Sequence, residues 1–261
     1  AAKMAGGNLS VKVDVKSSDE LGMLSATIND LSVQLQKNEQ LRKDLIANVS
    51  HEFRTPLSLI KGYAETIRDV TGDMKEKRDR QLNVILEETD RLKSLVDDIL
   101  DLSQMQSGNF QPDMMPFDIS ETVRNIVDRL SYMLEEKGIS LEVERDEKST
   151  VVIGDESRIE QVLYNFVSNA CSHTASGGRI FIAISVNGDT VRIEVSDNGM
   201  GIPPDELPYI WDRFYKAAKG GKGKGLGLSI AKEILEAHTG SYGVESNPGE
   251  GTLFWFCLKK A

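Results

Sequence analysis

Apolar residues recur at three- and four-residue spacing around His51, and this pattern constrains the fold more than any other feature of the chain. The positions are Ile46, Val49, Phe53, Pro56, Ile60, Tyr63, Ile67 and Val70. This spacing gathers them on one face of an amphipathic helix of the coiled-coil type. Because an α-helix turns by about 100° per residue, His51 falls on roughly the opposite face. The pattern therefore predicts a histidine presented to solvent, with Glu52 beside it and Thr55 one turn further along.

An exposed imidazole beside a carboxylate is suited to nucleophilic chemistry. A histidine that served the core would lie within the apolar stripe, whereas His51 lies outside it. Glu52 can take or orient the ring proton, which makes a ring nitrogen available for attack. His51 is therefore a candidate nucleophile and Glu52 a candidate base.

The apolar stripe begins well before His51. Asp19-Glu20 open a helical pattern with apolar residues in heptad register, namely Leu21, Leu24, Ile28, Leu31 and Leu35. The stripe shifts its phase near Asn38 and then enters the register of residues 46–70. We expect one nearly continuous helix over about 19–70 with a stutter, kinked at Pro56. Residues 1–17 alternate apolar and polar positions, which indicates an extended connector.

A second helix follows the break at Thr71-Gly72-Asp73. Its heptad stripe is Leu82, Ile85, Thr89, Leu92, Val96, Ile99 and Ser103. Two amphipathic helices joined by a short turn cannot bury both stripes within one chain. Pairing with a second copy would form a four-helix bundle and bury them. The sequence therefore predicts a homodimer.

After the helical hairpin the hydrophobic period changes. Residues 109–116 contain two prolines and read as a linker between domains. We expect helices and strands to follow at 119–137 (helix), 139–145 and 150–153 (strands), 155–171 (helix), 178–187 and 190–197 (strands), 225–238 (helix), and 241–246 and 251–258 (strands). The turn Asn187-Gly188-Asp189 predicts a hairpin between two central strands. Helices mixed with mainly antiparallel strands predict an α+β two-layer sandwich.

Composition narrows the function classes. The 261-residue chain carries a formal net charge of −10, which argues against a nucleic-acid partner because no basic stripe is present. No apolar run is long enough to span a membrane. Cys171 and Cys257 lie among apolar neighbours, and we expect buried free thiols in a reducing compartment. His173 and His238, near helix ends, are interpreted as C-terminal dipole partners, and such dispersed histidines predict no metal site of their own.

Two glycine-rich segments and a pair of asparagines are candidate ligand-binding features, although glycine-rich segments are also common in plain surface loops. The segment 197–201 (Asp-Asn-Gly-Met-Gly) follows a strand, and 221–228 leads into a helix. Backbone N–H groups at a helix start bind phosphate, although the Walker and Rossmann spacings are both missing. Asn165 and Asn169 lie one turn apart. They form either a plain polar helix edge or a pair of carboxamides facing a Mg²⁺–phosphate group.

Taken together, these features resemble the sensor histidine kinases of two-component signalling, over nearly the whole chain. The resemblance rests on motifs in the family's order and spacing: residues 50–56 resemble the H box, 165–170 the N box, 197–201 the G1 box, 211–215 the F box, 223–228 the G2 box and 249–252 the final glycine box. The resemblance implies a helical hairpin that forms a dimeric four-helix bundle, followed by an ATP-binding sandwich of the gyrase/Hsp90/histidine-kinase type.

The resemblance also implies roles for individual residues. His51 would be the phosphoacceptor and Glu52 its base, and Thr55 would position water for dephosphorylating a partner. Asp197 would accept the adenine amino group of ATP, and Asn169 would bind Mg²⁺. Lys216 to Lys224 would form a lid. The nucleotide-binding residues implied are Asn165, Asn169, Asp197, Gly199, Gly201, Phe214, Tyr215, Lys222, Lys224, Gly225, Leu226, Gly227 and Thr252.

The implied organisation has four parts. Residues 1–37 resemble part of a HAMP signal-transfer module, 38–108 form the dimerisation and phosphotransfer hairpin, 109–116 the linker and 117–261 the catalytic domain. The implied partner is the receiver domain of a response regulator. We expect this portion to act at the cytoplasmic side of a bacterial membrane, anchored through a segment outside the sequence.

The sequence departs from the family pattern after the second asparagine. The family usually has a basic residue and then an aromatic one, where this chain has Ser172 and His173. One phosphate contact is therefore missing, and Lys222 or Lys224 is a candidate substitute. The segment between Tyr215 and Gly223 is also short for a lid.

Two other functions compete with the histidine kinase. One is an ATPase or serine kinase of the gyrase/Hsp90-like superfamily, whose ATPases place a carboxylate where Asn165 stands. An amide cannot act as that base, so hydrolysis is disfavoured. The other is a coiled-coil scaffold that has lost the use of ATP, against which the retained motifs count.

Overall fold

The computed structural model describes residue 13 and residues 20–106, 110–146, 149–216 and 225–261. The chain divides into two compact units, residues 1–92 and 93–261. The expected connector over 1–17 and most of the expected lid lie outside the described residues, as do Lys222 and Lys224. Each unit is described here by itself.

A single long helix carries His51, as the heptad pattern predicted. Helix α2 spans Glu20–Thr66 and contains Pro56. The side chain of Pro56 is buried and those of Val49 and Phe53 are half-buried, whereas His51 and Thr55 are exposed. The exposed position predicted for His51 is confirmed. The predicted apolar face is buried only in part in the single chain, because its members Ile46 (58%) and Val70 (67%) are exposed, as are Leu21, Leu24, Leu31 and Leu35.

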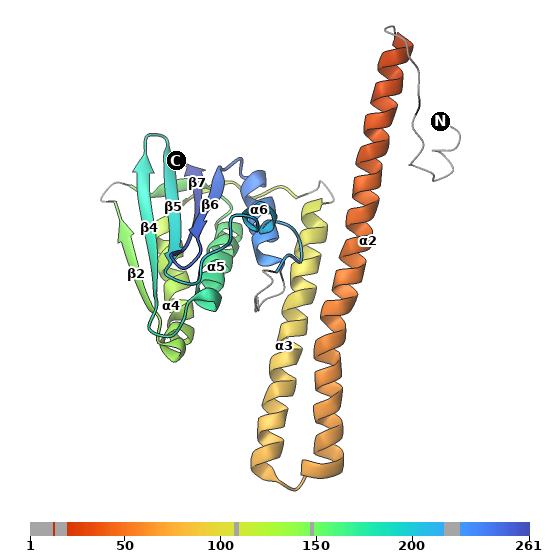
Figure 1. Cartoon of the computed structure of the whole chain (residues 1–261). Helices are drawn as coiled ribbons and strands as arrows, with labels where there is room; N and C mark the ends of the chain where they lie inside the picture. The colour runs from red at the N-terminus through yellow and green to blue at the C-terminus, as the bar shows by residue number, and fades with distance from the viewer. Residues whose placement is uncertain (1–12, 14–19, 107–109, 147–148, 217–224) are drawn as a thin grey trace. The chain divides into compact units, whose positions relative to one another are not determined.

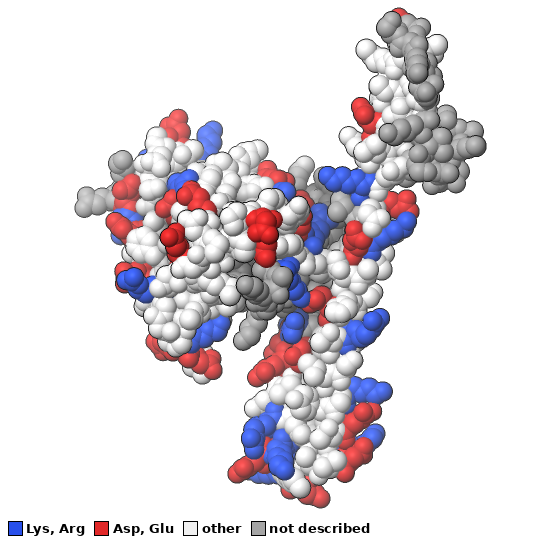
Figure 2. All heavy atoms as spheres, in the orientation of Figure 1, with Lys and Arg blue, Asp and Glu red and all other residues white. Residues whose placement is uncertain are grey.

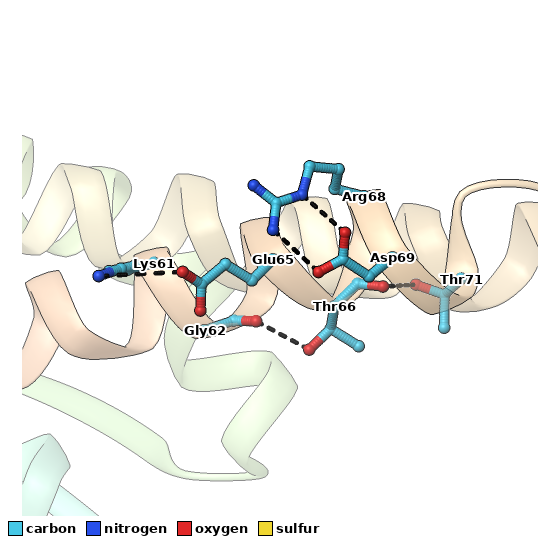
Figure 3. A network of polar contacts seen from close by, with 7 residues as sticks. All are labelled: Lys61, Gly62, Glu65, Thr66, Arg68, Asp69 and Thr71. Carbon is cyan, nitrogen blue, oxygen red and sulfur yellow. Dashed lines mark hydrogen bonds and ion pairs between the residues drawn. The ribbon is translucent and has the colours of Figure 1, made fainter.

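The helix ends in a π-helical turn that the sequence pattern did not predict. This turn, η1, spans Ile67–Thr71 and precedes helix α3, Lys75–Gln106, so the predicted break at residues 71–73 is confirmed. The hydroxyl of Thr71, a buried residue, lies 3.3 Å from the Thr66 carbonyl oxygen (Figure 3). The same hydroxyl lies 2.5 Å from Gln81 Oε1 on α3. These contacts tie the end of α2 to the start of α3 where the regular helical bonds stop.

The stripe on α3 is broader than predicted. Ile85, Leu92 and Ile99 are half-buried as expected, but the fully buried positions are Leu95, Leu102 and Met105. The predicted stripe members Leu82, Thr89, Val96 and Ser103 are exposed in the single chain, with Leu82 at 41% and Val96 at 40%. Apolar residues lie on both sides of Ile85, Leu92 and Ile99 on the helix surface. Periodicity alone therefore did not show which of the two flanks would be buried. On the face of the hairpin seen in Figure 2, acidic and basic side chains are interspersed.

The second unit contains a five-stranded mixed sheet with helices on one face (Figure 1). The strands are β2 (Ser140–Arg145), β4 (Arg179–Asn187), β5 (Thr190–Asp197), β7 (Gly251–Lys259) and β6 (Tyr242–Asn247), in that spatial order. Only the β2–β4 pair is parallel. The helices are α4 (Ile119–Lys137), α5 (Glu156–His173) and α6 (Gly227–Ala237). The predicted α+β two-layer sandwich is confirmed.

One strand was missed, and it shortens the linker. Strand β1, Met115–Asp118, pairs antiparallel with β3, Val151–Gly154, with Pro116 opposite Ile153. The linker predicted over 109–116 therefore ends before Met115. Proline is tolerated here because it stands in a two-stranded ribbon, where not every N–H must pair.

The core lies between the sheet and its helices. Alternate residues of β4, β5 and β7 are buried, including Ile182, Ile193 and Phe256. Phe166 of α5 packs against Phe254 with ring centroids 5.1 Å apart. Since α5 lies on the sheet through its apolar side, its polar side is available to line a site.

Candidate functional site

His51 stands on the outer face of α2 with no secondary-structure irregularity around it. The preceding Ser50 hydroxyl donates to the Ile46 carbonyl at 2.7 Å, which is ordinary back-bonding within a helix. Glu52 is half-buried and engaged in polar interactions, and Thr55 is exposed one turn beyond His51. The imidazole is therefore held on a rigid element and open to a reactant from solvent.

The second unit contains an open cavity of about 420 Å³ along the polar side of α5. Asn165, Asn169 and His173 contribute to it at four-residue intervals, so they form one row along the helix. The start of α6 and Thr252 of β7 also line it, as do residues that follow β5 and precede α6. Polar groups from separate segments thus converge on one concave site, as is typical of a ligand pocket.

Asn165 holds the start of α6 in place. Its Nδ2 donates to the carbonyl oxygen of Gly227 at 3.0 Å. A β-carbon at Gly227 would lie 3.0 Å from Asn165 Oδ1, so any larger residue there would displace the Asn165 side chain. This contact brings the N-terminal N–H groups of α6 to the wall of the cavity, where the helix dipole favours an anion.

Asp197 lies at the end of β5 and is tied to the backbone around it. Its Oδ1 accepts from the Gly199 N–H at 2.8 Å. Burial raises the pKa of the Asp197 carboxyl, while hydrogen bonds from the N–H groups of Gly199 and Thr252 and the proximity of His173 oppose the rise. The carboxyl is therefore a half-buried acceptor at a strand end, suited to an N–H donor of a ligand.

Glycines near Asp197 allow neighbouring main-chain segments to approach one another closely. A β-carbon at Gly199 would lie 2.5 Å from the His173 carbonyl oxygen. Gly251 has φ +97°, and a β-carbon there would collide with the main chain of Asp197. Gly225 has φ +70°, and its carbonyl accepts from the Phe214 N–H at 2.7 Å. A larger residue at any of these three positions would require the neighbouring backbone to move.

The predicted nucleotide residues fall into three groups. Those that line the cavity are Asn165, Asn169, Gly201, Tyr215, Gly225, Gly227 and Thr252. Those that contribute to its surroundings without lining it are Asp197, Gly199, Phe214 and Leu226, of which Leu226 is fully buried. Lys222 and Lys224 lie outside the described residues. His51, Glu52 and Thr55 belong to the other unit.

Other residues line the cavity that the sequence reasoning did not assign to it. These are Gln161, Ser168, Met200, Ile202, Ile210 and Leu228, among others. Gln161 and Ser168 share the α5 face of the two asparagines, so helical spacing from Asn165 would have found them. The apolar members come from turns and had no periodic signal.

The structure tests two expectations about single residues. His238 is buried at the C-cap of α6; its Nδ1 donates to the Ile234 carbonyl oxygen at 2.8 Å and its Nε2 accepts from the Asp155 N–H at 2.9 Å. His238 therefore bonds a carbonyl in the last turn of its helix, as expected of a C-terminal partner, and it also links α6 to the residue before α5. Both cysteines are free, but Cys257 is only half-buried because it points from β7 away from the covered face.

Within the described ranges, no group of three or more His, Cys, Asp or Glu side chains could hold a metal ion. Over the same residues, no helix has both the length and the apolar character needed to cross a membrane.

Comparison with family models divides the chain into three matches. Residues 154–261 match the histidine kinase-, DNA gyrase B- and HSP90-like ATPase model, residues 41–108 the His Kinase A phospho-acceptor domain, and residues 1–37 the HAMP domain. The first match implies ATP binding, and it contains every lining residue named from α5 onward.

Curated relatives agree with these matches. The chain is 36% identical over 241 residues to the sensor histidine kinase WalK of Bacillus subtilis, covering 90% of this chain and 39% of the relative. It is 30% identical over 269 residues to the sensor histidine kinase MtrB of Mycobacterium tuberculosis strain H37Rv, covering 99% of this chain and 47% of the relative. The chain therefore spans less than half the length of these relatives.

Solved structures show the same likeness. The catalytic domain of the histidine kinase ThkA matches at 30% identity and a TM-score of 0.52, over 57% of this chain and 96% of that one. ThkA in complex with the response regulator TrrA matches at 27% identity and a TM-score of 0.70, over 87% of this chain and 64% of that one. The chain belongs to the sensor histidine kinases of two-component systems.

Proposed function

We propose that this chain is the catalytic portion of a sensor histidine kinase, which phosphorylates its own His51 from ATP and passes the phosphoryl group to an aspartate of a response regulator. One observation carries the proposal. An exposed imidazole on α2 lies within the segment that matches the phospho-acceptor domain, and the same chain contains a cavity built around Asn165 and Gly227 within the ATPase match.

The chemistry follows from these groups. A ring nitrogen of His51 attacks the γ-phosphorus of ATP, the bond to the β-phosphate oxygen breaks, and ADP leaves. Glu52 takes the proton from the ring as the N–P bond forms. His51 and the cavity belong to different units, so the transfer requires an arrangement of the two units in which a ring nitrogen of His51 reaches the γ-phosphorus.

Asn169 is the residue that would hold Mg²⁺. Its carboxamide lines the cavity one turn from Asn165, whose amide already bonds to Gly227. Oxygen donors of this kind suit Mg²⁺, which is usually shared with substrate phosphates instead of being enclosed by a protein cage. Bound there, the ion would neutralise charge on the phosphates.

The partners follow from the family. ThkA forms a complex with the response regulator TrrA, and we propose a receiver domain as the partner of this chain. Thr55, exposed beside His51, would position water for dephosphorylating that regulator. A second copy would cover the exposed apolar flank of α3. The relatives are sensor kinases, and we place this portion at the cytoplasmic side of a bacterial membrane, anchored through a segment outside this sequence.

The ATPase alternative is weaker because Asn165 has no basic group to activate water. Its amide nitrogen is also committed to the Gly227 carbonyl. Steady release of inorganic phosphate without labelling of the protein would favour the ATPase. Failure to bind ATP with Mg²⁺ in calorimetry would favour the non-enzymatic scaffold.

The decisive experiment is incubation with γ-labelled ATP and Mg²⁺. We expect the wild-type chain to acquire a label that acid removes and alkali does not, as a phosphorylated imidazole should. His51→Gln should abolish the label, whereas Lys61→Gln, an exposed change on the same helix, should leave it unchanged. Acid-labile label on the His51→Gln variant would contradict the proposal.

A further inference from the structure

A second cavity lies at one edge of the five-stranded sheet, between helix α4 and the edge strand β2 (Figure 1). It has a volume of about 320 Å³. Its described lining residues are Ser120, Arg124 and Val127 of α4, Val143 and Arg145 of β2, and Ile184 of β4. None of them lines the cavity along α5, so the two cavities are separate sites.

The residue pattern of β2 explains why a cavity forms there. Side chains at alternate positions of a strand share one face, and paired residues of neighbouring strands point to the same face. Val143 and Arg145 pair with Ile182 and Ile184 of β4, which are buried under the helices. The helix-facing row of β2 therefore ends in a charged residue, and Val143 remains 46% exposed. Helix α4 leaves this part of the sheet open to solvent.

Helix α4 contributes three lining residues from one side of its apolar stripe. Ser120, Arg124 and Val127 are spaced by four and three residues, so they follow one another along the helix surface. The neighbouring Val123 and Ile126 are buried in the core. Helix α4 and strand β2 thus each contribute one arginine and one valine to the cavity.

The two arginines are the charged groups among the described lining residues. Arg145 donates from Nη1 to the Ser120 hydroxyl oxygen at 3.4 Å, and that hydroxyl donates to the Asp118 carboxylate at 2.8 Å. This chain of contacts orients the Arg145 guanidinium but uses one of its five N–H donors. Arg124 makes no hydrogen bond or ion pair with any residue the structure describes. Both guanidinium groups therefore have donors available for an anion.

Charge and size together define the class of ligand. A guanidinium binds a carboxylate through paired N–H···O bonds, and apolar side chains favour contact with hydrocarbon. Small-molecule pockets occupy about 300–1,000 Å³. A cavity of about 320 Å³ therefore suits a compact ligand. An inorganic anion would leave the apolar lining in contact with water, and a neutral hydrocarbon would make no use of the arginines.

We propose that the cavity between α4 and β2 binds a small organic acid, whose carboxylate pairs with Arg124 and Arg145. The hydrocarbon part of the acid would pack against Val127, Val143 and Ile184. Such a ligand would stabilise the domain, because a ligand that binds only the folded state shifts the unfolding equilibrium. The inference does not depend on the proposed function, since no residue that we assign to ATP binding or phosphotransfer takes part.

The test uses hexanoate as the probe, with acetate and 1-hexanol as matched controls, in saturation-transfer NMR titrations of the full chain. Acetate keeps the carboxylate but lacks four methylene groups, so we expect it to bind at least about tenfold more weakly than hexanoate. 1-Hexanol keeps the hydrocarbon but lacks the charge, and it should also bind at least about tenfold more weakly. Hexanoate should raise the melting temperature of the wild-type chain.

Two arginine variants locate the site. Arg124→Gln and Arg145→Gln should each weaken hexanoate binding by about five- to thirtyfold, because glutamine keeps a donor but loses the charge and the paired geometry. Arg129→Gln is the control, since Arg129 is an exposed arginine of the same helix that pairs with Glu160 at 2.8 Å outside the cavity. It should change the affinity by less than about twofold.

Thermal melts show whether each variant is folded, and Arg124→Gln alone decides the question if Arg145→Gln is not. A wild-type chain that does not bind hexanoate would overturn the proposal, as would acetate or 1-hexanol that binds as tightly as hexanoate. Full affinity in the folded Arg124→Gln variant would also overturn it. An equal loss in Arg129→Gln would show a response to the charge of the whole domain, which likewise rules out the site.

Discussion

At the scale of single residues, the two halves of the reaction depend on opposite environments. His51 and Thr55 are exposed, which suits the phosphoacceptor role that we propose for His51. Asp197 is half-buried and accepts hydrogen bonds from the backbone N–H groups of Gly199 and Thr252. An exposed nucleophile can be inferred from periodicity, whereas the burial of Asp197 depends on strands and turns that meet only in the folded domain.

The role of Glu52 as a base predicts a specific kinetic loss. Glu52→Gln should reduce the rate of autophosphorylation by about 10²–10⁴-fold, because the amide cannot take the His51 proton. The KM for ATP should stay near the wild-type value, since Glu52 belongs to the other unit from the nucleotide cavity. The measurement is single-turnover labelling at saturating ATP. A loss confined to KM would contradict the base assignment.

Replacing Asp197 should raise the thermal stability of the ligand-free chain and weaken its binding of MgATP. Burial raises the pKa of the Asp197 carboxyl in the folded state. The protonated carboxyl therefore contributes to the stability of the fold below the unfolded-state pKa, and this contribution is lost as the pH rises through the folded-state pKa. At pH 7 the ionised group is therefore unfavourable in the folded state, and Asp197→Asn should raise the melting temperature of the ligand-free chain.

The same Asp197→Asn variant should weaken MgATP binding by about tenfold or more, because the charged acceptor for the adenine amino group is lost. Thermal melts at pH 7 and below about pH 4 provide the control, since the stability gain should vanish once the wild-type carboxyl is protonated. A variant that is less stable at pH 7 and binds normally would refute both statements.

At the scale of elements, the carboxylate of Asp118 caps the N-terminus of helix α4. Asp118 caps α4 by accepting from the Ser120 N–H at 3.0 Å, and it also accepts from the Thr150 hydroxyl at 2.6 Å. Burial by itself would raise the pKa of Asp118, but the hydrogen bonds from Thr150 and Ser120 and the charge of Arg145 hold it below its usual value.

Removing this cap should destabilise the domain by a measurable amount. Asp118→Ala should lower the free energy of unfolding at pH 7 by about 1–2 kcal/mol, whereas Asp118→Asn, which can still cap, should lose less. A lowered pKa gives stability that is present above the unfolded-state pKa and lost as pH falls through the folded-state value. The difference between wild type and Asp118→Ala should therefore shrink in acid, as urea unfolding at several pH values would show.

At the scale of the whole molecule, we expect the hairpin to pair with a second copy. Apolar residues on one flank of α3, including Leu82 and Val96, remain exposed in the single chain although they fall in heptad register. Exposed heptad positions of this kind are typical of helices that pair with another chain. The family match of residues 41–108 to the phospho-acceptor domain is in keeping with this arrangement.

A charge on that flank should dissociate the dimer. Leu82→Glu places a carboxylate in the proposed interface of both copies, which is unfavourable because the charge would be buried without a partner. Asn83→Glu makes the same change in charge one residue along, at an exposed position off the stripe. Light scattering after size exclusion at micromolar concentration should show monomers for the first variant and dimers for the second. Dimers for both variants would place the interface elsewhere.

The sequence by itself determined the long helix, the outward position of His51, the order of the catalytic elements and the family. Each depends on local periodicity, turn residues or contiguous motifs, all of which are set by neighbours along the chain. It missed β1, since a short segment containing Pro116 is assigned as a strand only once β3 pairs with it.

Only the tertiary structure decided which flank of α3 is buried, which partners His238 bonds and how the cavity along α5 is lined. Leu95 and Leu102 are buried although Val96 fits the heptad equally well. His238 bonds to Asp155, which is 83 residues away in the sequence. His173 joins Asn165 and Asn169 in lining the cavity because the end of α5 meets the turn after β5. Such contacts between distant segments have no signature in local spacing, since they form only when the elements pack.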